Sequence, residues 1–270
     1  MTSQEKLLSQ ISEGRHIAVG LDPDLKKIPS HLLSEKNPIL TFNKEIIDTT
    51  YKYAASYKLN FAFFEKYGTE GFSTLFDTIS YIPKDKLIIA DAKRGDIGNT
   101  SKMYAESIFN GFNSDAVTLH PYMGYDSVEP FLEFEDKLSF ILALTSNKGS
   151  ADFEKLTLKD GSFLFQQVIK NTLLWNTHNN CGLVFGATNE QELDENISLF
   201  GSLPVLLPGI GAQGGSLEKV VSSFKKNGKD NYLINVSRSV IYKDSSRDFA
   251  KAAMQEVVAL NQEIEKIKGH

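Results

Sequence analysis

The sequence predicts an α/β protein built as one (β/α)8 (TIM) barrel, a single domain over residues 1–270 with a short N-terminal helix. Eight short apolar runs, rich in β-branched residues, recur along the chain, and segments with helical spacing separate them. Buried strands that alternate with helices indicate a parallel sheet covered by helices, and eight such units in about 250 residues are typical of a closed barrel. The predicted strands are 16–21, 57–61, 87–90, 116–119, 140–144, 182–185, 204–207 and 232–236.

Helical spacing is clearest in four places between and after these strands. The segments are 46–51, 164–173, 217–224 and 249–260. In each segment apolar residues recur three or four positions apart, as they do on the buried face of a helix. We therefore expect these segments to form part of the outer layer of the barrel.

A doubly wound sheet is the alternative fold. It requires a Gly-x-Gly-x-x-Gly turn directly after the first strand. The first run is followed instead by Gly20-Leu-Asp-Pro-Asp24, and the chain contains no linker, low-complexity stretch or repeat of fixed period. The barrel is therefore the preferred interpretation.

Composition excludes several classes of function. The net charge of −5 and the pI of about 5.6 leave no basic surface for nucleic acid. Cys181 is the single cysteine, which rules out a disulfide framework and favours a reducing compartment. The N-terminus does not resemble a signal sequence, and no apolar run approaches the ~20 residues that span a membrane. We expect a soluble, cytoplasmic protein.

Polar residues gather where the predicted strands end. The active site of a (β/α)8 barrel forms at the carboxyl ends of its strands. After strands 7 and 8 the chain has a glycine-rich segment, 208–215, and then Arg238. Glycines let the backbone approach an anion closely, and an arginine adds a charge-assisted contact. These two places are the usual phosphate site of the fold, so we expect a phosphorylated ligand.

The densest group of charges follows the third predicted strand, in LIIADAKRGDIGNTS (87–101). Asp91 and Lys93 alternate, so their side chains point the same way from positions about 7 Å apart. Lys58 and Asn60 do the same on the preceding strand, and Asp96 could add a second carboxylate. A structural ion-pair network is the alternative, but buried charges are costly and this one lies at the catalytic end.

A lysine flanked by carboxylates suits a particular chemistry. Its charged form is favoured, which makes it a poor Schiff-base nucleophile and a good fixed cation and proton donor. A neighbouring carboxylate would repel an anionic group on the substrate. The residues therefore favour proton delivery to carbon on a phosphorylated substrate, coupled to loss of a carboxylate.

The segment DAKRGDIGNT (91–100) resembles the Asp-x-Lys-x-x-Asp signature of the orotidine 5'-phosphate decarboxylase family, which catalyses the last step of UMP synthesis. The stretches KLNFAFFE, VTLHPYMG, LPGIGAQGG and NVSRSVIY resemble the longer, second type of that family. The similarity runs from Gly20 to beyond Arg238, and its motifs occur in the same order. The long segments 24–37 and 146–161 fit the second type.

The resemblance implies a role for each charged residue. Lys93 would donate a proton to C6 of the pyrimidine after CO2 leaves. Asp91 would lie against the substrate carboxylate, and Lys58 would lie between it and the ribose. Asp96 would complete a Lys-Asp-Lys-Asp array by reaching the partner's site in a homodimer, and Thr100 would follow it across the interface.

The resemblance also implies the remaining contacts with orotidine 5'-monophosphate, and a reaction without metal or organic cofactor. The implied contacts are Asp22 and Asn60 with the ribose, Ser146 with the edge of the pyrimidine ring, and Gln213 and Arg238, with backbone amides near Gly211 and Ser237, with the phosphate.

Two other functions remain open. A Mg2+-dependent decarboxylase or aldol-type synthase acting on sugar phosphates uses the same Asp-x-Lys-x-x-Asp frame. Proteins resembling it carry an acidic ligand on the second strand, where this chain has Lys58. A barrel that only binds a nucleotide phosphate would keep the glycine-rich loop and Arg238, but would not need Asp91, Lys93 and Asp96 together.

Overall fold

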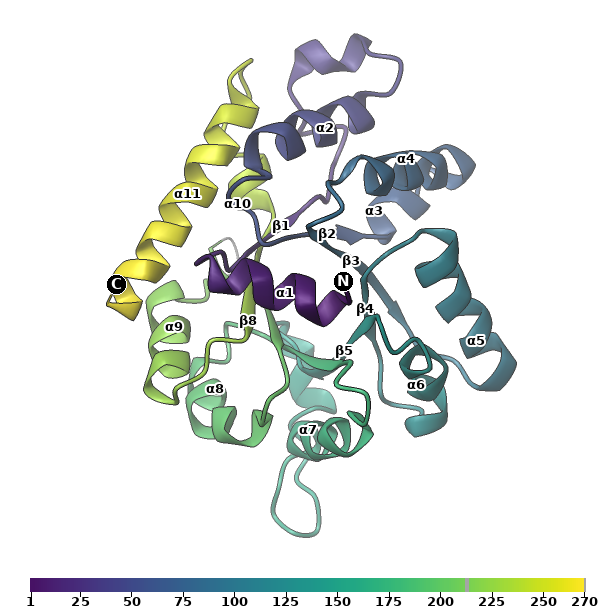
Figure 1. The fold of residues 1–270 in the computed structure, drawn as a ribbon, viewed down its shortest axis with the longest axis vertical. Coiled ribbons are helices and arrows are strands. Elements are labelled where there is room, and N and C mark those ends of the chain that lie inside the picture. The colour runs from purple at the N-terminus through teal and green to yellow at the C-terminus, as the bar shows by residue number, and fades with distance from the viewer. Residues whose placement is uncertain (212–213, 270) are drawn as a thin grey trace.

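Eight parallel strands close into a barrel in the order in which they occur along the chain. The computed structural model describes residues 1–211 and 214–269. Helices surround the strands on the outside (Figure 1). The barrel predicted from the apolar runs is therefore confirmed. The strands are β1 Ile17–Gly20, β2 Ser56–Asn60, β3 Leu87–Arg94, β4 Ala116–Leu119, β5 Leu138–Leu144, β6 Cys181–Phe185, β7 Val205–Pro208 and β8 Tyr232–Val236.

Three of the segments with helical spacing lie within α7, α9 and α11, and the segment 46–51 ends one residue beyond α2. Further helices fill the other connections. The described residues include no helix that combines the length and apolarity needed to span a bilayer. The helices are α1 Ser3–Ser12, α2 Pro38–Thr50, α3 Ala62–Glu65, α4 Gly68–Tyr81, α5 Gly98–Glu106, α6 Tyr125–Leu132, α7 Leu164–Trp175, α8 Glu190–Asn196, α9 Leu217–Lys226, α10 Arg238–Ile241 and α11 Phe249–Lys268, with short 3-10 or π turns η1 Ser30–Ser34, η2 Ser107–Gly111, η3 Lys148–Asp152 and η4 Ile197–Phe200.

Strand β3 continues four residues beyond its predicted end at residue 90. It pairs regularly with β2 up to Asp91, whereas its register against β4 shifts between Ala90 and Arg94. The apolar pattern ends at Ala90 because the following residues carry charge. They remain in the strand because each charge has a partner: Asp91 pairs with Lys58 of β2 and with Lys93, and Arg94 pairs with Glu65 of α3.

Helix α1 closes the end of the barrel at which the strands begin (Figure 1). A capping box on Thr2 starts the helix, and Leu7 and Ile11 join the apolar cluster inside the barrel. Ser3 Oγ donates to the carbonyl oxygen of Asp115, the residue that precedes β4. Helix α1 thus seals this end of the barrel interior.

The buried His16 imidazole joins the start of β1 to the end of α11. Its Nδ1 lies 3.1 Å from the carbonyl oxygen of Tyr232, and its Nε2 lies 3.3 Å from Lys268 Nζ. Burial lowers the pKa of His16, against the opposing effects of that carbonyl and of Asp230. The folded state therefore holds the imidazole neutral, while the unfolded chain takes up a proton near pH 6.5.

We expect the free energy of unfolding to fall as the pH drops below about 6.5, towards the lower pKa of folded His16. Above that pH the contribution of this residue is fully present. Urea denaturation at pH 7.5, 6.0 and 5.0 measures the effect. In His16→Phe, which keeps a ring against Tyr232, the loss over this range should be smaller; an equal loss would show that other groups cause it.

Candidate active site

A cavity of about 540 Å³ opens at the carboxyl ends of the strands. This volume is typical of sites that hold a small molecule. Seven of the candidate residues contribute to its wall: Asp22, Lys58, Asn60, Asp91, Lys93, Ser146 and Arg238. Gln213 lies outside the described residues. The sequence thus identified side chains from separate strands that the fold brings into one cavity.

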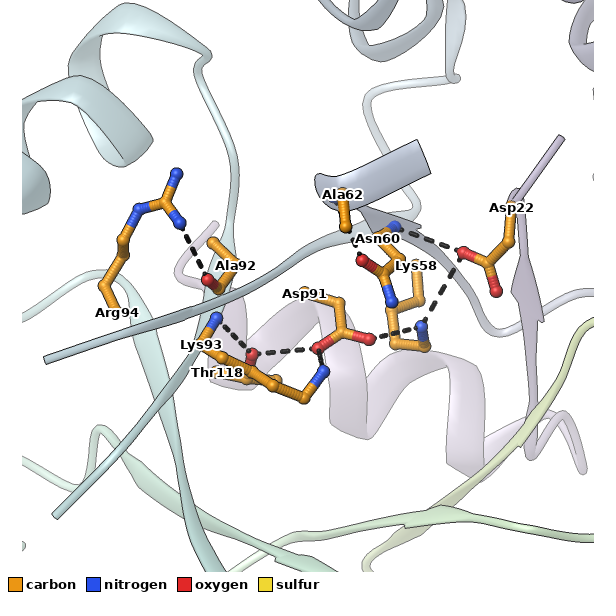
Figure 2. Close-up of polar contacts among 9 residues, drawn as sticks. All are labelled: Asp22, Lys58, Asn60, Ala62, Asp91, Ala92, Lys93, Arg94 and Thr118. Carbon is orange, nitrogen blue, oxygen red and sulfur yellow. Dashed lines mark hydrogen bonds and ion pairs between the residues drawn. The ribbon is translucent and has the colours of Figure 1, made fainter. Parts of the chain in front are cut away.

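Four charged groups form a continuous array in this cavity (Figure 2). Lys58 Nζ lies 2.7 Å from Asp91 Oδ2, and Lys93 Nζ lies 2.6 Å from Asp91 Oδ1. Asp22 Oδ1 lies 4.0 Å from Lys58 Nζ on the other side. The order Asp22–Lys58–Asp91–Lys93 therefore alternates in sign within one chain.

Burial differs along the array. The side chains of Lys58 and Asp91 are 5% and 10% exposed, whereas that of Lys93 is 45% exposed. Desolvation opposes the charge on Lys58, but Asp22 and Asp91 outweigh it and raise its pKa. Desolvation likewise opposes the charge on Asp91, but the two lysines hold its pKa well below its usual range. Lys58 and Asp91 are therefore both ionised at neutral pH.

Asp22 and Asn60 are held together beside the array. The backbone N–H of Asn60 donates to Asp22 Oδ1 at 3.2 Å, and Asn60 Oδ1 accepts from the backbone of Ala62 at 3.1 Å. Position 20, two residues before Asp22, requires a glycine because a Cβ there would lie 2.6 Å from the Cβ of Ser237. Strands β1 and β8 can therefore approach closely, so that Asp22 and Ser237 both line the cavity.

The other end of the cavity lies between the loops after β7 and β8. Gly209, Ile210, Arg238 and Ser239 line it. Gly209 and Gly211 have φ values of 111° and 74°, which an L side chain rarely adopts. Arg238 begins α10 and is exposed. Backbone and guanidinium groups at this place suit a phosphate.

The turn after β5 is held on several sides. The Glu154 carboxylate accepts the N–H of Thr145 at 2.6 Å, and Asn189 Nδ2 donates to the Thr145 carbonyl oxygen at 2.9 Å. Thr188 Oγ1 donates to the carbonyl oxygen of Ser146 at 3.3 Å. The long segment after β5 therefore returns through Glu154 to fix the residues that line the cavity.

Gly186 allows this turn to pack against β6. A Cβ at position 186 would lie 2.7 Å from the Ser146 nitrogen and 2.8 Å from its Cα. Gly186→Ala is therefore expected to cost about 1–3 kcal/mol of stability and to displace Ser146. Urea denaturation measures the first effect, and ligand affinity the second. Gly111→Ala is the control, because its Cβ would meet only one atom, at 3.9 Å; equal stability of both variants would contradict the packing argument.

Several cavity residues were not predicted from the sequence. Asp24, Lys27 and Tyr242 lie in the wall near Asp22, and Thr118 lies beneath Asp91. The phenol of Tyr242 accepts the N–H of Asp24 at 2.7 Å, and burial raises its pKa to about 12, so it stays protonated. Thr118 had a recognisable signal, since it is a polar residue inside an apolar strand, and so did Asn235 of β8, which also lines the cavity.

Asp96 and Thr100 do not line the cavity of this chain. Asp96 Oδ1 accepts the adjacent N–H of Ile97 at 2.8 Å, and Thr100 is exposed on α5. Within one chain the second carboxylate of the array is that of Asp22. The reach of Asp96 and Thr100 into a partner's site stays a prediction.

Cys181 has a structural role, whereas His120 is an exposed residue just after β4. Cys181 is fully buried, and burial raises the pKa of its thiol to about 12, so it is no nucleophile at neutral pH. The His120 backbone N–H donates to the Arg94 carbonyl oxygen at 2.9 Å. Over residues 1–211 and 214–269, no three His, Cys, Asp or Glu side chains converge in the way a metal centre requires.

Comparison with known proteins agrees with the geometry. A family model described as orotidine 5'-phosphate decarboxylase / HUMPS matches residues 15–253. An orotidine 5'-phosphate decarboxylase of Flavobacterium johnsoniae is 46% identical over 270 residues, which cover 99% of this chain and 98% of that protein. One from Porphyromonas gingivalis is also 46% identical, over 98% and 97% of the two chains.

Solved structures give the same result. The OMP decarboxylase of Leishmania donovani superimposes with a TM-score of 0.81 at 35% identity, over 97% of this chain and 100% of that one. The UMP synthase of the same organism gives a TM-score of 0.86 at 36% identity over 97% of this chain, which spans only 56% of that longer protein. The chain belongs to the orotidine 5'-phosphate decarboxylase / HUMPS family.

Proposed function

We propose that this protein decarboxylates orotidine 5'-monophosphate to UMP and CO2, the last step of de novo pyrimidine nucleotide synthesis. The observation that carries the proposal is the array Asp22–Lys58–Asp91–Lys93. It places an ionised carboxylate between two lysines at the open end of the barrel. Relatives that are 46% identical over almost the whole chain have the same activity in their names.

The array suits decarboxylation without an electron sink. The bond between C6 and the carboxylate breaks, CO2 leaves, and the electron pair stays on C6. Lys93 then gives an ammonium proton to C6, which produces UMP. Because no cofactor delocalises the carbanion, its stabilising cation has to be in place before the charge develops. Asp91, which lies against Lys93, would face the substrate carboxylate.

Binding of the remote groups would hold the base against this array. The phosphate would lie between Arg238 and the backbone of the loop after β7, the loop that contains Gln213. Asp22 and Asn60 would hold the ribose, and Ser146 the edge of the pyrimidine. Binding energy from the phosphate can then offset the unfavourable approach of the substrate carboxylate to Asp91.

A homodimer completes the proposed site. Exposed apolar side chains surround the segment that carries Asp96 and Thr100: Ile97 and Met103 are 54% and 48% exposed, and Tyr104 is 37% exposed. A second copy that covers this surface would bring Asp96 and Thr100 to the neighbouring cavity. Exposed apolar side chains grouped along one segment suit an interface with a second copy.

Mixed subunits test the contribution of Asp96. Lys93→Ala and Asp96→Asn should each be inactive alone, because each dimer lacks either the proton donor or the partner's carboxylate in both sites. After the two are unfolded and refolded together, hybrid dimers contain one site with both residues intact, and activity should return. Continued inactivity of the mixture would exclude action across the interface.

The alternative is a Mg2+-dependent decarboxylase or synthase acting on sugar phosphates. The ammonium of Lys58 argues against it, because it already occupies the space between Asp22 and Asp91. A divalent ion at that place would have to displace a buried cation. Such a metal would instead need an acidic residue on β2.

Ultraviolet absorbance separates the two functions. Orotidine 5'-monophosphate is added to protein pretreated with EDTA, and its loss is followed with time. Conversion to UMP at the rate of untreated protein supports the proposal. Absence of conversion, together with activity on sugar phosphates that requires added Mg2+, would establish the alternative.

A further inference from the structure

The backbone at Lys93 adopts an unusual conformation. Its φ is 47°, in the left-handed region that residues other than glycine rarely adopt. The conformation lies in the bulge of β3: Ala90 and Arg94 are four positions apart, while their partners Val117 and Leu119 are only two positions apart. Such strain persists only where the surroundings enforce it.

Arg94 holds the carbonyl oxygen of the peptide that joins Ala92 to Lys93. Its side chain folds back, and Nη1 donates to the Ala92 oxygen at 2.9 Å (Figure 2). The same guanidinium donates through Nη2 to Glu65 Oε1 at 2.7 Å. Its central carbon lies 5.3 Å from the centre of the Tyr104 ring. The guanidinium is therefore fixed by α3 and α5 while it contacts β3.

Thr118 holds the other polar group of that peptide. Its buried hydroxyl oxygen accepts the N–H of Lys93 at 3.1 Å and donates to Asp91 Oδ1 at 3.0 Å. Asp91 Oδ1 is also the atom that receives the Lys93 ammonium. One hydroxyl therefore sets both the backbone of Lys93 and the carboxylate that its side chain meets.

We propose that Arg94 and Thr118 are positioning residues for Lys93. Together they bind both polar groups of the Ala92–Lys93 peptide and keep Lys93 in its left-handed conformation. That conformation turns its side chain back towards Asp91, at the open end of the barrel. This inference rests on the proposed function, because it gives Lys93 the role of proton donor.

The arrangement predicts a specific kinetic defect. In Thr118→Val and in Arg94→Met one polar group of the peptide loses its partner, and Lys93 relaxes towards extended backbone. We expect kcat to fall roughly 100-fold, the effect of an error of about 1 Å in the position of a reacting group. KM should change by less than about threefold, since the ground-state contacts of the ligand remain.

Matched variants separate positioning from a general loss of structure. Thr118→Ser keeps the hydroxyl and should restore a kcat near that of wild type. Arg247→Met removes an exposed arginine that does not line the cavity and should leave kcat unchanged. The urea midpoint of each variant shows whether it is folded. Wild-type kcat in both folded Thr118→Val and folded Arg94→Met would overturn the inference.

The crystal structure of the double variant Arg94→Met/Thr118→Val gives an answer that needs no activity. A negative φ at Lys93, with Nζ withdrawn from Asp91, supports the positioning role. An unchanged φ near +47° with the 2.6 Å contact intact overturns it. Wild-type protein without decarboxylase activity would instead contradict the proposed function alone, and the crystal structure would still decide the conformational part.

Discussion

Lys93→Ala is expected to lower kcat for orotidine 5'-monophosphate by roughly 10⁴-fold, because one side chain supplies both the proton and the stabilising cation. The fold should tolerate the change. The Lys93 side chain is 45% exposed, and Asp91 keeps Lys58 as a partner at 2.7 Å. Steady-state absorbance measures kcat, and urea denaturation measures stability.

Lys219→Ala is the matched control for this variant. Lys219 forms an exposed ion pair with Glu190, and its loss should affect neither activity nor, by more than about 1 kcal/mol, stability. Binding of the product UMP should remain measurable in Lys93→Ala, which shows that the site is intact. A kcat within tenfold of wild type would mean that another group delivers the proton.

The second large effect concerns stability. Asp91→Leu is expected to lower the free energy of unfolding by about 3–5 kcal/mol, because it leaves the buried Lys58 charge without its close partner. Asp22, at 4.0 Å, is too distant to replace the lost contact. The same variant should be inactive, since the carboxylate that faces the substrate is gone.

The double variant Lys58→Met/Asp91→Leu tests the physical reason. With both charges replaced by apolar side chains, most of the lost stability should return, because a buried ion pair and an apolar pair of similar volume are often nearly equivalent. Activity should not return. Urea denaturation of the two variants makes the comparison. If the double variant is no more stable than Asp91→Leu, the unpaired charge is not the cause of the instability.

The sequence predicted the barrel because its strongest signals are the regular recurrence of buried apolar runs and the helical spacing between them. Each apolar run contains at least half of a strand, and strands that run in parallel bring their carboxyl ends together. That rule alone placed Lys58 and Asp91 in one cavity. The position predicted for Asp91 agrees with the structure because β2 and β3 pair regularly, which sets Asn60 beside Asp91.

The sequence could not predict what depends on irregular backbone. Alternation predicted that Lys93 points the same way as Asp91, and the two side chains do meet. The bulge and left-handed φ through which they meet depend on side-chain contacts with Arg94 and Thr118. Thr118 lies on β4, and Arg94, although it ends β3 itself, is fixed by Glu65 of α3, so no local pattern records the arrangement.

Long loops were the second obstacle. Glu154 and Lys27 follow β5 and β1 in segments without regular period, and only the folded chain shows that they return to the cavity or to the turn beside it. The action of Asp96 in a partner's site likewise stays a prediction, because one chain cannot test it. A cytoplasmic location stays a prediction.

The seal at the base of the barrel determines where this molecule can be attached to something else. The first residues lie there, with Ser3 bonded to Asp136 before β5, and α11 ends there, with Lys268 bonded to Asp230 before β8. A tag, surface linker or fused domain joined at either terminus would therefore sit behind the barrel. Molecules attached to a surface through a terminus would point the open end of the cavity away from that surface, so a ligand could diffuse to the site freely.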